Sequence, residues 1–160
     1  MTLPDIGQLV PHAGAMVLLD CVVSVDADNL CAAVAITDRS MFCRTQGVGS
    51  WVGIEYMAQA IAAHAGWLAR QKGEPVHIGF LLGSRRYECN APVFAQGTLL
   101  HVHVQLEIKD ENGLGAYICR IEDAARPGQV LAQGTITVFQ PENIDEFMQG
   151  SSNSNGNQHE

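Results

Sequence analysis

The segment SWVGIEYMAQAIAAHAGWLA, residues 50–69, decides the fold of this 160-residue chain. It is rich in Ala, contains no Pro and is closed by Gly73, so it predicts one long helix. The helix is apolar on almost every side, which predicts that it is buried. Twenty apolar-rich residues could also span a membrane, but Glu55, Gln59 and His64 inside the run argue against insertion.

Strand patterns surround this helix. In Leu100–Lys109 apolar and polar residues alternate, which is the period of a half-buried strand, and Asn112-Gly113 signals a hairpin turn. The predicted strands are Met16–Val25, Leu30–Ile36, Val76–Cys89, Thr98–Lys109, Leu114–Glu122 and Val130–Phe139. Because the helix needs cover and the sheet needs a covered face, we predict an α+β fold with an antiparallel sheet wrapped around one long central helix.

The composition fits a single domain whose surface is partly covered. Hydrophobic residues make up 47% of the chain and charged residues only 16%, against a usual charged fraction of about 25%. The low charge favours burial of part of the surface against another copy of the chain. We assign residues 1–141 to one domain and predict that the polar residues 142–160 form a disordered tail.

The net charge of −8 argues against nucleic acid and anionic membrane as partners, because both attract basic surfaces. The five cysteines include no C-x-x-C pair, and no basic and apolar leader opens the chain. We therefore expect reduced thiols in a cytoplasmic protein, without a disulfide framework or a metal site.

Glu55 is the sharpest candidate for chemistry. It lies between Ile54 and Tyr56 in an apolar run without a basic neighbour, and a carboxyl group buried without a partner costs several kcal/mol or keeps its proton. We therefore predict a buried general acid or base. Gln59 lies one turn on and could orient the carboxyl group or a substrate carbonyl. The structural alternative is that Glu55 hydrogen-bonds a backbone group or caps the first turn.

A glycine-rich turn precedes Glu55. Gly47, Gly49 and Gly53 suit a tight turn into a helix N-terminus, where backbone N–H groups polarise a carbonyl oxygen. We therefore predict an oxyanion hole within about one turn of Glu55. The turn matches neither a nucleophile elbow nor a nucleotide-binding loop.

The histidines offer Glu55 no clear partner. His64 follows Glu55 by nine residues and therefore points to the opposite side of the helix, which predicts a packed or interface residue. His101 and His103 share a strand face and could bind a metal as a pair. No third ligand is evident in the sequence, so a solvated outer face is favoured. His77 lies at the start of a strand without an obvious partner.

Arg85 and Arg86 form the densest basic spot of this acidic chain. They mark either a docking point for an anionic partner or ordinary solubilising charge. Regular strand alternation would leave only one of the two side chains outward.

Three segments resemble the hotdog-fold 3-hydroxyacyl-acyl-carrier-protein dehydratases of bacterial fatty acid synthesis, in particular the branch encoded with aryl polyene pathways. Leu9–Asp20 is similar to that family's Leu-Pro-His opening. Glu55–Ala60 is similar to its Glu-Ala-Met-Ala-Gln-Ala helix, and Ile78–Arg85 is similar to the strand after the helix. The match spans about residues 8–140.

The resemblance implies a homodimer, or a heterodimer with another hotdog subunit, and no cofactor. It implies a substrate held as a thioester on the phosphopantetheine of acyl carrier protein. Glu55 takes the catalytic carboxylate role, and Arg85 or Arg86 is expected to dock the carrier protein. The expected substrate-binding residues are Gln59, Gly49, Ser50, Trp51, Gly79 and Phe80.

One family residue is missing. The family's catalytic His precedes the Glu by about fourteen residues, in a Gly-His-Phe-Pro motif, and Met41 occupies that position here. Three explanations are open: His12 folds back to the site, another hotdog subunit supplies the histidine, or Glu55 acts alone. We expect elimination of water from a 3-hydroxyacyl thioester, with Glu55 and His12 as catalytic candidates. The alternatives are a thioesterase in which Glu55 activates water and a non-catalytic subunit that completes a mixed dehydratase.

Overall fold

The computed structural model describes residues 3–10, 16–75 and 80–139. The elements in chain order are α1 (Ile6–Leu9), β1 (Cys21–Val25), β2 (Asn29–Ala35), β3 (Gly47–Gly49), the 3-10 helix η2 (Ser50–Val52), α2 (Gly53–Gln71), β4 (Phe80–Cys89), β5 (Val93–Ala95), β6 (Leu99–Lys109), β7 (Leu114–Asp123) and β8 (Val130–Phe139). His12, His77, Gly79 and the tail 142–160 lie outside the described residues, and the predictions made for them stay predictions.

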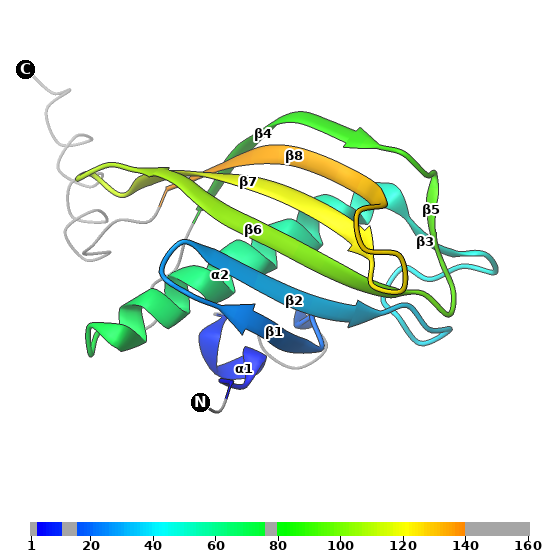
Figure 1. Ribbon diagram of the computed structural model, residues 1–160, viewed down its shortest axis with the longest axis horizontal. Coiled ribbons are helices and arrows are strands. Elements are labelled where there is room, and N and C mark those ends of the chain that lie inside the picture. Colours follow the sequence, from blue (N-terminus) through cyan, green and yellow to red (C-terminus); the bar gives the residue numbers. More distant parts are fainter. Residues whose placement is uncertain (1–2, 11–15, 76–79, 140–160) are drawn as a thin grey trace, which may run out of the picture.

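A six-stranded sheet forms the body of the fold, in the order β1-β2-β6-β7-β8-β4. Every neighbouring pair is antiparallel. The sheet curves over α2, which runs beneath the strands, and α1 lies beside β1 at the lower edge of the view (Figure 1). β3 and β5 pair separately beside the start of α2. The predicted arrangement of one central helix under an antiparallel sheet is therefore confirmed.

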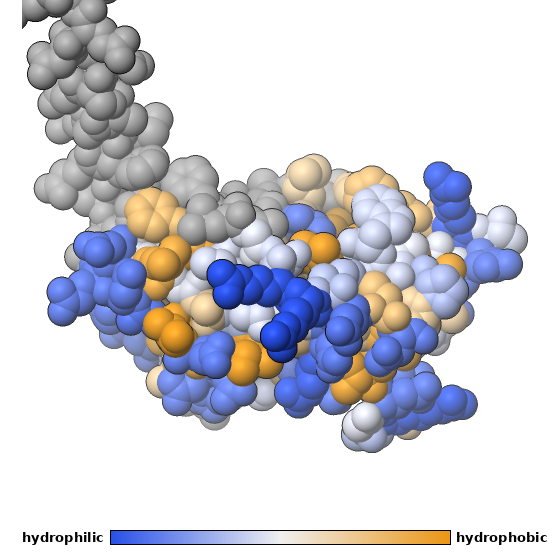
Figure 2. Space-filling model, turned by 90° about the horizontal axis from the view of Figure 1, so that it is seen from above, coloured by the Kyte–Doolittle hydropathy of each residue, from blue (hydrophilic) through white to orange (hydrophobic). Residues whose placement is uncertain are grey.

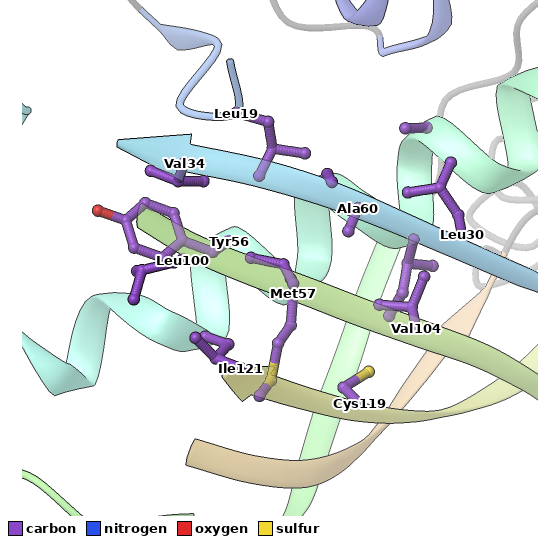
Figure 3. Close-up of a cluster of buried hydrophobic side chains, with 14 of the residues drawn as sticks. Leu19, Leu30, Val34, Tyr56, Met57, Ala60, Leu100, Val104, Cys119 and Ile121 are labelled. Carbon is purple, nitrogen blue, oxygen red and sulfur yellow. The ribbon is translucent and has the colours of Figure 1, made fainter. Parts of the chain in front are cut away.

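The core lies between α2 and the concave face of the sheet. Tyr56, Met57 and Ala60 of the helix are buried there against alternate residues of the strands, because side chains in a strand alternate between its two faces. Figure 3 shows this contact. The sheet contributes Leu30 and Val34 from β2, Leu100 and Val104 from β6, and Cys119 and Ile121 from β7.

Helix α2 approaches α1 so closely that one position has no room for a side chain. A Cβ atom on Gly66 would lie 2.1 Å from the carbonyl oxygen of Leu9. Such a separation is far below any van der Waals contact, so the glycine is what allows the two helices to meet.

The structure differs from the predicted elements at several places. The strand predicted over Met16–Val25 begins only at Cys21. The helical segment begins with a 3-10 turn at Ser50 before α2 starts at Gly53. The short strands β3 and β5 were not predicted, because three residues are too few to show a strand period. A register shift between Leu106 and Ile108 breaks the alternation of β6, so Ile108 is 61% exposed instead of facing inward.

Strand β4 lies at one edge of the sheet and is interrupted by a bulge. Its pairing with β8 shifts register between Arg85 and Glu88, and Arg86 has a φ of +54°. Both arginines are exposed as a result, which corrects the expectation from regular alternation.

Seen from above, the surface mixes hydrophilic and scattered hydrophobic side chains (Figure 2).

Candidate active site at the start of the central helix

The start of the helical segment is fixed by contacts with β4 and with the chain that follows it. The backbone N–H of Ser50 donates to the carbonyl oxygen of Pro92 over 3.0 Å, and the Tyr87 hydroxyl donates to the carbonyl oxygen of Ser50. Burial raises the pKa of Tyr87, so the hydroxyl keeps its proton for this bond. A Cβ on Gly53 would collide with the same hydroxyl. The glycines of this turn therefore serve close packing.

Glu55 and Gln59 are brought together by one turn of α2. The side-chain N–H of Gln59 donates to Oε1 of Glu55 over 3.3 Å and to the carbonyl oxygen of Met16 over 2.7 Å. Its oxygen accepts from the backbone N–H of Leu18 over 2.8 Å. Gln59 is 1% exposed. It therefore connects the chain before β1 to the helix and orients the carboxylate of Glu55 at the same time.

Glu55 itself is exposed, which corrects the prediction that it is buried. The sheet covers only one side of α2, and Glu55 falls on the other side, whereas its neighbour Tyr56 is 2% exposed and faces the core. The apolar pattern of the segment does not distinguish a side covered by the sheet from a side covered by a partner.

A pocket of about 470 Å³ opens beside Glu55. The pocket lining consists of Met16, Leu18, Met41, Phe42, Trp51, Val52, Ile54, Glu55 and Gln59. Among these described residues the only ionisable side chain is that of Glu55. The pocket therefore presents one carboxylate, held by one amide, at an otherwise apolar wall, which suits a ligand with an apolar chain and one polar group.

Two exposed aromatic residues form the rim of this pocket. Phe42 is 52% exposed and Trp51 is 65% exposed, and their ring centroids lie 5.5 Å apart. Phe42 has a φ of +66°, a backbone conformation that is costly for a bulky residue and typical of functional sites. The sequence analysis missed Phe42, since no residue type around it signals a left-handed backbone.

Met41 lies in the pocket lining with Glu55. The sequence comparison placed Met41 where the related dehydratases carry their histidine. No histidine lines the pocket among the described residues, and His12 lies outside them.

His64 lies on the opposite side of α2, as predicted, and is fully buried. Its Nδ1 is 2.9 Å from the hydroxyl of Tyr117, and its Nε2 is 3.0 Å from the carbonyl oxygen of Asp26. The carbonyl can only accept, so Nε2 carries the proton and the tyrosine hydroxyl donates to Nδ1. Burial lowers the pKa of His64. This histidine is a packed core residue and takes no part in the site.

The other residues predicted to bind substrate fall into two groups. Gly49 and Trp51 line a neighbouring pocket of about 530 Å³ that shares Phe42 and Trp51 with the first, and Ser50 between them in the chain is buried. The predicted docking residues Arg85 and Arg86, and the backbone of Phe80, belong to β4, away from both pocket linings.

The antiparallel sheet wrapped around one central helix places the chain in the hotdog class of folds. Within that class the chain belongs to the ApeP-like family, described as ApeP dehydratase, whose model matches residues 4–149. The dehydratase-like function expected from the sequence, of the kind found in aryl polyene pathways, is therefore confirmed at the level of the family, and the protein is a lyase in this broad sense.

Solved structures agree with this assignment. A chain of the dehydratase heterocomplex ApeI:P from Xenorhabdus doucetiae is 30% identical, with a TM-score of 0.82, over 92% of this chain and 97% of that one. The PaaI protein of E. coli (14% identity, TM-score 0.56, 74% and 80% covered) shares the fold. So does a hypothetical thioesterase with coenzyme A from Streptococcus pneumoniae TIGR4 (10%, 0.58, 74% and 83%). No curated protein matches the chain.

In the part of the chain that the structure describes, no helix has both the length and the apolarity needed to cross a bilayer.

Proposed function

We propose that this chain supplies the carboxylate half of a dehydratase site that eliminates water from a 3-hydroxyacyl thioester. The observation that carries the proposal is Glu55, oriented by Gln59 at the wall of an apolar pocket beside the start of α2. Elimination requires one group to take the α-proton and a group to protonate the departing hydroxyl. Among the described residues that line the pocket, Glu55 is the ionisable group.

The start of the helical segment supplies a further requirement, which is stabilisation of the negative charge on the thioester oxygen. The thioester oxygen gains negative charge as the α-proton leaves, and the first backbone N–H groups of a helix stabilise such charge. Ser50 begins that segment, and Trp51 follows it at the rim of the pocket. A thioester carbonyl placed there would lie within one helical turn of Glu55.

We further propose that a second hotdog subunit supplies the missing histidine. Met41 stands at the position of the family's histidine and lines the pocket, so this chain brings no imidazole from that position. The exposed side of α2 that carries Glu55 also presents the half-buried small side chains of Ala58 and Ala62, which allow close approach of another surface. The similar ApeI:P heterocomplex supports a mixed assembly.

The substrate arm is proposed to be the phosphopantetheine of acyl carrier protein, with no cofactor. The exposed Arg85 and Arg86 offer a local positive surface on an acidic chain, and carrier proteins are acidic by the family resemblance. Reversal of charge at Arg85 should slow turnover of the carrier-bound substrate and leave turnover of the same acyl group on free pantetheine unchanged. Equal slowing of both substrates would exclude this docking role.

The decisive experiment compares Glu55→Gln with Glu107→Gln, an exposed carboxylate on β6. Each variant is assayed with 3-hydroxyacyl carrier protein, alone and together with any co-encoded hotdog subunit, and enoyl product is measured. We expect Glu55→Gln to lower the rate at least 100-fold and Glu107→Gln to have no effect. Unchanged enoyl formation in Glu55→Gln would leave the chain a non-catalytic subunit. Release of free thiol without enoyl product would identify a thioesterase instead.

A further inference from the structure

The outer face of the sheet carries a second group of reactive side chains, on strands that do not line the pocket. Cys31 of β2 is the direct partner of His103 of β6, and His101 lies two residues from His103 on the same face. One donor atom from each of these three residues falls within 4.8 Å of the other two. The sequence offered the two histidines without a third ligand, and the pairing of β2 with β6 supplies it.

Cys31 lies on the outer face of β2 but is buried there, at 4% exposed, like its same-face neighbour Ala33. Its neighbours Leu30 and Ala32 point into the core, so Cys31 points the other way. Its Sγ lies 3.9 Å from Nε2 of His103, and the rings of His103 and His101 stand edge to face with centroids 6.1 Å apart. The thiol therefore lies beside the two imidazoles.

A carboxylate stands next to these groups. Oε2 of Glu122, on β7, lies 3.4 Å from Nε2 of His103, and its other oxygen accepts from Nε of Arg120 over 2.8 Å. The carboxylate of Glu122 therefore adds negative charge beside the cysteine and the two histidines.

We propose that Cys31, His101 and His103 bind a zinc ion on the outer face of the sheet, with the fourth ligand position open and the carboxylate of Glu122 close to His103. Sulfur, imidazole and carboxylate are the ligands that zinc takes in proteins, at about 2.3 Å from sulfur and about 2.0–2.2 Å from nitrogen or oxygen. Tetrahedral geometry then needs donor atoms roughly 3.3–3.7 Å apart. The three donor atoms lie within 4.8 Å of one another, so side-chain rotations that move them about 1 Å closer together give that spacing.

The charges balance when zinc binds. The thiolate is the form of cysteine that binds zinc, so the thiol of Cys31 must give up its proton. Zinc displaces that proton, a Zn–S bond forms, and one proton leaves for each ion bound. The thiolate and Glu122 then neutralise the two positive charges of the ion. Arg120 is the nearby opposing charge, and it stays paired with Glu122.

The site is tested on the full chain without a histidine tag, titrated with zinc chloride in two buffers of different ionisation enthalpy. We expect one zinc ion and one released proton per chain, together with a higher unfolding temperature. Cobalt(II) in place of zinc should give a thiolate charge-transfer absorption. These readouts are independent of dehydratase activity, so a failure here leaves the proposed function untouched.

Variants separate this site from weak binding at surface histidines. Cys31→Ala and His103→Gln should each weaken zinc binding by more than about 100-fold, whereas loss of a residue that only orients a ligand costs about 10–100-fold. Cys21→Ala, which removes an exposed cysteine of the neighbouring strand, should change nothing. His101→Gln removes the third proposed ligand at a half-buried position, so it should also weaken zinc binding. It provides a further test if one of the other two variants fails to fold. Binding that survives Cys31→Ala, or that releases no proton, would overturn the proposal.

Discussion

Replacement of Gln59 by leucine tests the link between the site and the fold. The substitution keeps the volume of the side chain but removes the acceptor for the Leu18 N–H and the donor to the Met16 carbonyl oxygen. Each backbone group left without a partner costs about 1–3 kcal/mol, so the two together cost about 4 kcal/mol. Burial of the leucine returns about 2 kcal/mol. The net loss of about 2 kcal/mol lowers the unfolding temperature of a domain of this size by roughly 4–8 °C.

The same substitution removes the N–H group that orients Glu55. A hydrogen bond to a charged group is worth about 1.5–3 kcal/mol, and the 3.3 Å separation places this one at the lower end. We therefore expect dehydration by Gln59→Leu to slow about 10-fold in the assembled enzyme. Enoyl product formation and a thermal melt are measured on the same preparation.

Glu55→Gln is the matched control for this prediction. It removes the carboxylate at an exposed position, so it should abolish activity while the unfolding temperature changes little. Gln59→Leu, by contrast, should lower both. If Gln59→Leu unfolds within about 1 °C of the parent protein, the loss of the two backbone hydrogen bonds costs no more than the roughly 2 kcal/mol that the leucine returns, and the predicted cost of about 4 kcal/mol is wrong.

Three further predictions concern the fold. Gly66→Ala should destabilise the chain by about 1–3 kcal/mol in urea melts, because the added Cβ meets the Leu9 carbonyl oxygen. This loss is expected despite the higher helix propensity of alanine. Equal or higher stability would contradict the close approach of the two helices. Tyr117→Phe should cost about 1–3 kcal/mol, since it leaves Nδ1 of His64 without a donor. Burial lowers the pKa of His64, so the unfolded chain binds a proton at this residue more readily than the folded chain does. The free energy of unfolding should therefore be highest well above pH 6.5 and should fall as the pH drops below that value. The dependence of the unfolding free energy on pH should be weaker in His64→Gln.

The sequence predicts the larger elements because they have clear periods. The apolar run of α2 and the alternation of Leu100, Val102 and Val104 survive in the structure with those strand residues buried. Strict alternation fails where the backbone inserts an irregularity, at Ile108 and at Arg86, because a bulge changes the face of every later residue.

The candidate site was predictable only in part. Glu55 and Gln59 lie one helical turn apart, so helix geometry alone brings them together. The exposure of Glu55 and the position of Phe42 depend on which side of the helix the sheet covers and on a loop with a left-handed residue. Likewise, the approach of Cys31 to His103 depends on the register between two strands that are far apart in sequence.

The bulge in β4 also bears on how this protein avoids fibre formation. An edge strand with a long, flat row of free backbone groups invites unlimited addition of further strands. In β4 that row is broken at Arg86, and two adjacent cations stand at the break. Replacing Arg85 and Arg86 with valine would favour a straight, uncharged edge. Thioflavin fluorescence of that double variant, compared with the parent chain at equal concentration, should report the aggregation that the native edge suppresses.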